Sequence, residues 1–150
     1  MKIIAHRGNI YGPDKKNENK PEHLMNAINK NLYVELDLWK IDNELFLGHD
    51  KPQYKILIDF LLKYKEKIFC HCKNIEALHY LLSNNFDIEC FFHNNDKCVL
   101  TSKQNIWNYT GTRLTNKSIC VMPEISNQKI EKCIGVCTDY CINYLNKIIN

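Results

Sequence analysis

The sequence predicts an α/β protein, namely a compact, shortened (β/α)8 barrel with reduced helices in its second half. Three observations lead to this prediction. The first half alternates apolar strand-like runs with amphipathic helical segments, which is typical of a parallel sheet. The second half has further strand-like runs with little helix between them, and the runs number about eight in all. An open α/β sheet is the alternative, because 150 residues are few for a closed barrel, which usually takes ~250.

The elements of the first third follow from local patterns. The apolar run Lys2–Ala5 ends in His-Arg-Gly, which predicts a strand that leads into a loop. Glu22–Asn31 has apolar residues at helical spacing and follows Pro21, which favours a short amphipathic helix. At Tyr33–Trp39, aliphatic residues alternate strictly with other residues, including two acids, as in a strand with two different faces.

The remaining elements are shorter. The pattern predicts a helix at Ile56–Lys67, a strand at Ile68–Lys73 and a helix at Ile75–Leu82. A last helix is expected at Cys141–Ile149. Between them, five apolar runs predict strands, at Ile88–Phe92, Cys98–Thr101, Ile106–Tyr109, Ser118–Met122 and Ile134–Thr138. No repeat or linker divides the chain, so we expect one domain over residues 1–150.

Composition excludes several classes of protein. Hydrophobic residues make up 45% and charged residues 25%, which argues against a disordered or fibrous chain. No apolar run approaches the ~20 residues that cross a bilayer. The start, MKIIAHRGN, is a poor secretory signal. A net charge of +3 is too weak alone to imply nucleic acid. We therefore expect a soluble, cytoplasmic protein without a nucleic-acid partner; its oligomeric state stays open.

The eight cysteines are expected to be free and mostly buried. No CxxC pair is present, and most cysteines lie in apolar runs, where a thiol packs as a small hydrophobic group. A Cys/His zinc module formed by Cys70, His71 and Cys72 is a weaker alternative.

Two acids and two histidines point to chemistry. Glu35 and Asp37 are two residues apart on one strand, so they share a face, and burying both there is costly without a cation. Such oxygen ligands suit Mg²⁺ or Ca²⁺. An edge strand whose acids simply meet water is the alternative. His6 and His49 follow strands at the same expected edge of the sheet, where an acid/base pair could cleave a phosphodiester.

Four motifs, in this order, resemble the glycerophosphodiester phosphodiesterase family. They are HRG at 6–8, ENKPEHL at 18–24, VELDLW at 34–39 and LGHD at 47–50. A fifth segment, IGVCTDY at 134–140, is similar to the segment with which that family closes. The resemblance implies a metal-dependent phosphodiesterase with the TIM-like (β/α)8 barrel that the family shares with phosphatidylinositol-specific phospholipase C.

The resemblance also implies a role for each matching residue. His6 and His49 would be the catalytic pair, and Glu35 and Asp37 would hold the cation. Arg7, one of two arginines in the chain, would contact phosphate. The further members are Glu18, which would orient His6 and Arg7 or approach the metal, and Lys73, which would contact phosphate.

The main departure from the family is at His71. The family has Glu-x-Lys where this chain has His71-Cys72-Lys73, so His71 would replace a carboxylate as a metal ligand. An imidazole could shift the preference of the site toward Mn²⁺ or Zn²⁺, weaken it, or move the third ligand to Glu124 or Asp139. Aromatic side chains that could line a wall for the substrate's alcohol group are Trp39, Trp107 and Tyr109, and His93 is a further candidate near the site.

These inferences lead to one expected function and one alternative. We expect a hydrolase that acts on glycerophosphodiesters or related phospholipid headgroups and uses a divalent cation. The alternative is a catalytically weak or inactive barrel that binds a phosphorylated ligand.

Overall fold

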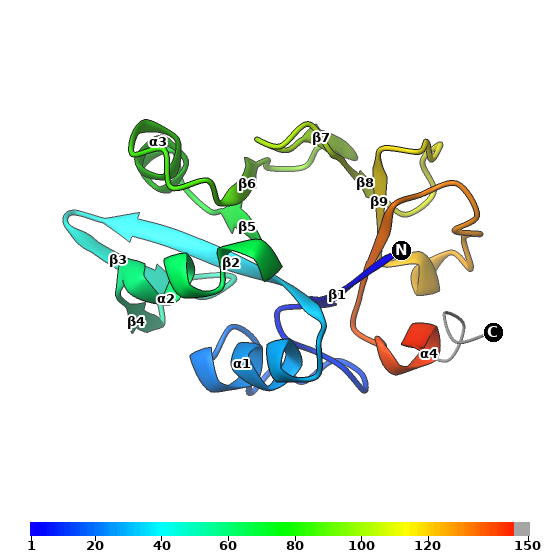
Figure 1. The fold of residues 1–150 in the computed structure, drawn as a ribbon, viewed down its shortest axis with the longest axis horizontal. Helices are drawn as coiled ribbons and strands as arrows, with labels where there is room; N and C mark the ends of the chain where they lie inside the picture. Colours follow the sequence, from blue (N-terminus) through cyan, green and yellow to red (C-terminus); the bar gives the residue numbers. More distant parts are fainter. Residues whose placement is uncertain (146–150) are drawn as a thin grey trace.

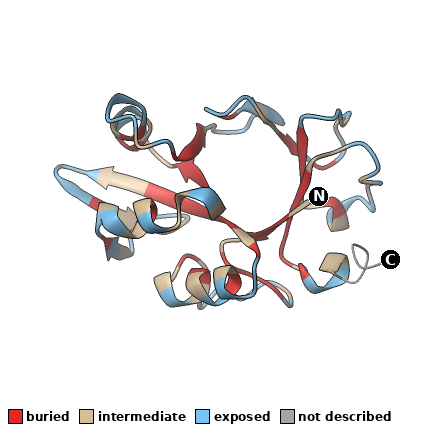
Figure 2. Ribbon diagram, in the orientation of Figure 1, coloured by how far each residue is buried: buried red, intermediate tan, exposed pale blue. Residues whose placement is uncertain are grey.

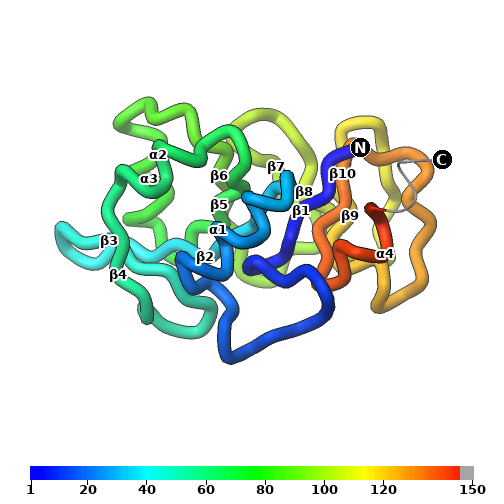
Figure 3. Tube along the Cα trace, turned by 60° about the horizontal axis from the view of Figure 1, so that its bottom comes forward, coloured from blue at the N-terminus to red at the C-terminus, as the bar shows by residue number. Residues whose placement is uncertain are grey.

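The computed structural model of the chain describes residues 1–145 and is built on one curled sheet of ten strands (Figure 1). Along the curl the hydrogen-bonded order is β6 (Glu89–Phe92), β5 (Ile68–Cys72), β2 (Tyr33–Ile41), β1 (Lys2–His6), β10 (Gly135–Thr138), β9 (Ser118–Val121), β8 (Ile106–Tyr109) and β7 (Cys98–Leu100). Strands β3 (Glu44–Leu47) and β4 (Tyr54–Ile56) extend the outer part of β2. Figure 3 shows β1 beside β10, so the first and the last strand in sequence order pair at the middle of the sheet.

The prediction of a (β/α)8 TIM-like barrel is wrong. The sheet forms a curled half-barrel, and it is mixed, because β3, β4 and β7 pair antiparallel with their neighbours. No ladder joins β6 to β7 within residues 1–145, although Ser102 N–H donates to the Cys90 carbonyl at 2.8 Å. The connections in the second half are short and rich in Asn, Thr and Ser, which favour turns over helices.

Four short α-helices are present in the described part of the chain. They are α1 (Pro21–Asn29), α2 (Ile58–Lys63), α3 (Ile75–Ser83) and α4 (Ile142–Leu145), and two 3₁₀ turns, η1 (Lys65–Lys67) and η2 (Pro123–Ile125), accompany them. The last helix was expected at Cys141–Ile149; α4 accounts for Ile142–Leu145, and positions 146–149 of this prediction lie outside the described residues. None of the helices described is both long and apolar enough to cross a lipid bilayer.

All eight expected strands are present, whereas the β3–β4 region differs from the prediction. Asp42 and Asn43 form a two-residue hairpin turn between β2 and β3, in which Asp42 has a φ of 49°. The helix expected at Ile56–Lys67 is divided among the end of β4, α2 and η1. The Asp-Asn pair between two apolar runs is a hairpin signal that could have been recognised.

The alternation in β2 separates the core from the site. Val34, Leu36 and Leu38 are buried in the apolar cluster that packs against α1 and α3. Glu35 and Asp37, between them, face the inside of the curl. Figure 2 shows that buried residues concentrate along the central strands. A second cluster inside the curl is formed mainly by Ile4, Phe69, Phe91, Trp107 and Ile119.

All eight cysteines are free, and six of them are buried, as expected. Cys70 and Cys72 lie in the cluster against the helices, while His71 points to the opposite face of the strand. The three residues cannot bind one zinc ion together, which removes the Cys/His module as an alternative.

Replacing Asn74 by alanine should lower the free energy of unfolding by about 2 kcal/mol, because a helix cap and a strand contact are lost together. The Asn74 side chain accepts from Ala77 N–H at the start of α3, and it bonds both the N–H and the carbonyl of Lys40 in β2. Urea unfolding measures the loss. Asn84→Ala, which removes one exposed bond to the Tyr80 carbonyl, is the control and should cost much less; equal costs would contradict the prediction.

Candidate functional site

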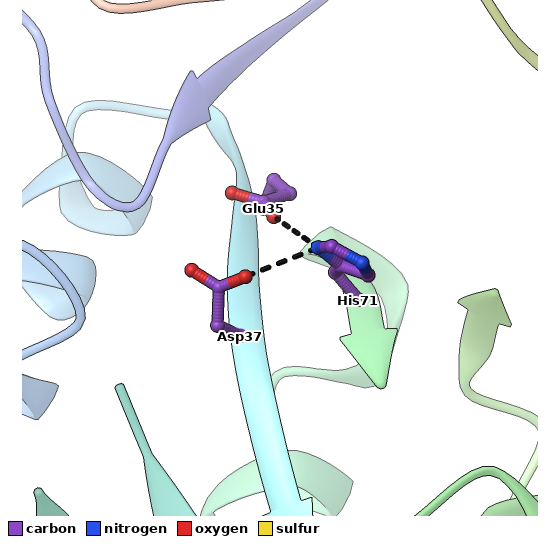
Figure 4. A group of neighbouring side chains, drawn as sticks. All are labelled: Glu35, Asp37 and His71. Atoms are coloured by element: carbon purple, nitrogen blue, oxygen red, sulfur yellow. Dashed lines mark ion pairs between the residues drawn. The ribbon is translucent and has the colours of Figure 1, made fainter. Parts of the chain in front are cut away.

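A buried acidic cluster lies on the inner face of β2 and β5. Asp37 and His71 are register partners on these parallel strands, so their side chains project side by side. His71 Nδ1 is 3.1 Å from Asp37 Oδ1 and 3.8 Å from Glu35 Oε1 (Figure 4). The exposed fractions are only 3% for Glu35, 0% for Asp37 and 9% for His71. One ligand atom from each residue falls within 4.8 Å of the others, so the cluster could hold a metal ion.

Two positive side chains surround this cluster. Arg7 Nε lies 3.1 Å from Asp37 Oδ2. The backbone N–H of Arg7 also donates to Glu35 Oε2, at 3.2 Å. Lys73 Nζ, just beyond the end of β5, lies 3.5 Å from Asp37 Oδ1. Both residues that the sequence analysis assigned to phosphate are therefore at the site, where they partly neutralise the carboxylates.

Glu18 holds Arg7 from the side away from the cluster. Arg7 Nη1 donates to Glu18 Oε2 at 3.0 Å, and Asn9 Nδ2 donates to Glu18 Oε1 at 3.1 Å. Of the two roles that the resemblance allowed for Glu18, its contacts match the orienting one, and it is outside the three-residue group that could bind a cation.

Asn19 fixes the backbone and the side chain of Asp37, a role the sequence analysis missed. Asn19 Nδ2 donates to Asp37 Oδ2 at 2.8 Å, and its Oδ1 accepts from Asp37 N–H at 2.9 Å. It has a φ of 64°, in the left-handed region that Asn tolerates better than most residues. Asn19 lies in the ENKPEHL segment that carries the family resemblance, but a single sequence does not show which buried acid its amide would bond.

The two acids of the cluster differ in their electrostatics. Burial is the largest influence on both and raises the pKa of each. In Glu35 the neighbouring charge of Asp37 adds to this effect, so the pKa of Glu35 lies above its usual value. In Asp37 the contact with His71 and the charges of Arg7 and Lys73 outweigh burial, so its pKa lies below the usual value.

The residues present fit a divalent cation. Asp37 Oδ1 is buried and has no hydrogen-bond partner, although it lies between two nitrogen atoms. The raised pKa of Glu35 shows that its positive neighbours do not fully compensate the burial of an ionised carboxylate there. Carboxylate oxygens and imidazole nitrogens are both ligands that divalent cations accept.

His6, at the end of β1, forms a dyad with Asp139. Its Nδ1 lies 2.8 Å from Asp139 Oδ1, which also accepts from Asn9 Nδ2 at 2.8 Å. Asp139 follows β10, the neighbour of β1, so sheet pairing brings the two together across the chain. Burial, the largest influence, lowers the pKa of His6, but the bond to Asp139 and the charge of Glu35 together raise it above the usual value.

His49 lies in the loop after β3 and forms a second dyad. Its Nδ1 is 2.6 Å from Asp50 Oδ1, and its side chain is 41% exposed. Gly48 donates to the Asp37 carbonyl and has a φ of 147°; a Cβ there would clash with the Lys51 carbonyl. A glycine is therefore required to turn this loop over the acidic strand.

A cavity of about 340 Å³ joins these groups. Six of the eight predicted site residues line it, namely His6, Arg7, Glu35, His49, His71 and Lys73. Asp37 lies beneath it, and Glu18 lines an adjoining cavity of about 370 Å³ together with Arg7 and His49. Of the expected aromatic wall, Trp107 and Tyr109 line the cavity, whereas Trp39 Nε1 instead donates to the Gly48 carbonyl.

The third member of the cluster is His71 rather than either of the other candidates. Glu124 accepts from Thr138 Oγ1 and Asp139 N–H, and Asp139 is engaged by His6. His93 is also at the cavity, where its ring stacks on that of His71.

The chain matches no protein-family model, no curated protein and no solved structure.

Proposed function

We propose that the protein is a phosphodiester hydrolase that uses a divalent cation, with His6 and His49 as its acid/base pair. One observation supports this most directly. Two histidines, each bonded through Nδ1 to a carboxylate, line the same cavity as a buried carboxylate–imidazole cluster. The order of motifs that resembles the glycerophosphodiester phosphodiesterase family agrees with this assignment.

Glu35, Asp37 and His71 would hold the cation. A bound divalent cation would withdraw charge from the phosphoryl oxygens and stabilise the charge that develops in the reaction. The two carboxylates suit Mg²⁺ or Ca²⁺, and the imidazole also admits Mn²⁺ or Zn²⁺.

Arg7 and Lys73 would bind the phosphate. Both line the cavity and already lie against Asp37. Arg7 is further fixed by Glu18, so its guanidinium is pre-oriented, and this geometry suits two oxygens of one phosphate. Lys73 would supply a second positive charge.

The two histidines would move the protons. Because Asp139 occupies Nδ1 of His6, Nε2 is the nitrogen left for proton transfer. The raised pKa of His6 favours its protonated form, so His6 would donate a proton to the leaving alkoxide as the P–O bond breaks. His49 would take a proton from the attacking oxygen as the new P–O bond forms. The attacking group is water or a neighbouring hydroxyl of the substrate.

The cavity would accept a small alcohol. Trp107, Tyr109, Val121 and Met122 form its less polar side, opposite the charged residues. A cavity of about 340 Å³ is at the lower end of the range for small-molecule sites. A cavity of this size has room for a glycerophosphodiester or a related phospholipid headgroup.

Hydrolysis of bis(p-nitrophenyl) phosphate and glycerophosphocholine tests the proposal. The protein is treated with a chelator, and Mg²⁺, Ca²⁺, Mn²⁺ or Zn²⁺ is then returned separately. We expect turnover only with a cation present. His79→Ala, which removes an exposed histidine of α3 bonded only to Ser83, is the control and should retain full turnover.

Folded protein that turns over neither substrate with any cation would contradict the proposal. The favoured function would then be binding of a phosphorylated ligand without cleavage. The contacts of both Arg7 and Lys73 with Asp37 are the observation that supports this second candidate, since they neutralise the site without a cation.

A further inference from the structure

His71 supplies a nitrogen ligand at a fixed position. Its Nδ1 faces both carboxylates, at 3.1 Å from Asp37 and 3.8 Å from Glu35. Strand β5 pairs on one side with β2 and on the other with β6, so the backbone of His71 cannot shift easily. The ligand atom is therefore placed by the sheet itself.

The ring of His71 is also held in its orientation. It stacks on two rings of the neighbouring strand region, with centroid distances of 5.1 Å to Phe91 and 4.5 Å to His93. The interplanar angles are 8° and 3°, so the three rings are nearly parallel. Rotation of the imidazole away from the carboxylates would break both stacking contacts.

A fixed imidazole changes which cations the cluster favours. Mg²⁺ and Ca²⁺ are hard ions that prefer oxygen ligands, and Ca²⁺ requires six to eight of them. The cluster offers oxygens from only two side chains, Glu35 and Asp37. Mn²⁺ shares the preference of Mg²⁺ for carboxylate oxygen, but as a first-row transition ion it gains more than Mg²⁺ from an imidazole nitrogen, and this gain increases from Mn²⁺ to Co²⁺.

The two positive side chains beside the cluster also favour transition-metal ions over Mg²⁺. Arg7 and Lys73 lie against Asp37 and reduce the negative charge that the cluster offers. This loss of electrostatic attraction is similar for every divalent ion, but Mg²⁺ gains little from the imidazole to offset it. The imidazole of His71 is a ligand whose bonding depends less on net charge, so binding of a transition ion should be less affected.

We propose that the site formed by Glu35, Asp37 and His71 selects Mn²⁺ and related transition-metal ions over Mg²⁺ and Ca²⁺. The inference rests on the proposed function for the identity of the site, but it concerns binding and needs no turnover. Mn²⁺ is the probe, because the thiols of the chain would add sites for Zn²⁺.

Binding of Mn²⁺ to the chelator-treated protein is followed by electron paramagnetic resonance, with Mg²⁺ and Ca²⁺ as competitors. We expect Mn²⁺ to bind at least about tenfold more tightly than either competitor. Pulsed measurements on the bound Mn²⁺ should show the ¹⁴N modulation of a coordinated imidazole. Equal affinity for Mn²⁺ and Mg²⁺, or no ¹⁴N signal, would overturn the inference.

His71→Glu is the variant that tests the cause. It replaces the nitrogen by oxygen, so the ratio of Mn²⁺ to Mg²⁺ affinity should fall toward one and the ¹⁴N signal should disappear. His71→Gln provides the same spectroscopic readout if the extra charge prevents folding. His79→Glu makes the matched change on the exposed side of α3 and should leave both readouts unchanged. A ¹⁴N signal that persists in both His71 variants would assign the ligand elsewhere and contradict the inference.

These results are separate from the test of function. Selective Mn²⁺ binding through nitrogen, without hydrolysis, would support the inference and count against the hydrolase. Hydrolysis supported equally by Mg²⁺ and Mn²⁺, with no ¹⁴N signal, would support the hydrolase and overturn the inference.

Discussion

Replacing His6 by alanine should lower the turnover of a phosphodiester by about 10²–10⁴-fold, because the leaving alkoxide then lacks its proton donor. Steady-state kcat with a saturating cation measures the effect. His6 is partly buried and its side chain bonds Asp139, so circular dichroism and urea unfolding must show that the variant is folded. His79→Ala, the exposed control, should keep the turnover of the unchanged protein. Turnover within about threefold of that value in folded His6→Ala would exclude His6 from the chemistry.

Asp139→Asn distinguishes a positioning role from catalysis. Asp139 raises the pKa of His6, so its neutral replacement should lower that pKa. An acid must be protonated to act, and the fall of kcat at alkaline pH should therefore begin at a lower pH in Asp139→Asn. A uniform loss of turnover with an unchanged pH profile would indicate only a structural role for Asp139.

The residues on the inner face of β2 could be predicted, because the alternation that identifies them lies within one short segment of the sequence. Strict alternation of aliphatic with other residues over Tyr33–Trp39 places Glu35 and Asp37 on one face, and the structure confirms it. His71 could be placed on the same principle, because Cys70 and Cys72 beside it are apolar in character. The alternation of residues along the sequence was sufficient to predict which face of a single strand each side chain occupies.

Closure of the sheet could not be predicted from local period. Strand count suggested a barrel, but β7 turns back on β8, and β3 and β4 extend β2 outward. These differences depend on tight turns such as Asp42-Asn43 and on pairing between distant segments. The helix content is also lower than a (β/α)8 barrel requires. In the second half, the polar connections form turns, in which their backbone N–H and carbonyl groups are satisfied without helices.

The supporting residues of the site show the same limit. Three loop residues each bond a predicted site residue. Asn9 bonds Glu18, and Asn19 bonds Asp37. Asp139 bonds His6, which is 133 positions away in the sequence. Asn19 and Asp139 lie in two of the segments that carry the family resemblance, but the sequence alone does not show which site residue each of them bonds. Only the pairing of β1 with β10 explains why Asp139 reaches His6.

Asp37→Asn and Glu35→Gln should both weaken cation binding strongly, but only Asp37→Asn should destabilise the cation-free protein. Each variant removes one charged ligand of the cluster, and Mn²⁺ affinity should fall by about 100-fold or more. Asp37 has a lowered pKa, so its charge favours folding at neutral pH; Arg7 and Lys73 lose that partner, and Asp37→Asn should cost about 1–3 kcal/mol.

Glu35 has a raised pKa, so its charge opposes folding at neutral pH without a cation. Glu35→Gln should therefore leave the free energy of unfolding unchanged or increase it. Urea unfolding in the presence of chelator compares the two variants, and Glu44→Gln, at an exposed carboxylate of β3, is the control. A large loss of stability in Glu35→Gln would show that the Glu35 carboxylate stabilises the folded protein itself, which would contradict a role restricted to cation binding. Opposite signs in the two variants would instead mean that the fold tolerates an unfavourable charge on Glu35, as expected of a residue whose partner is a bound ion.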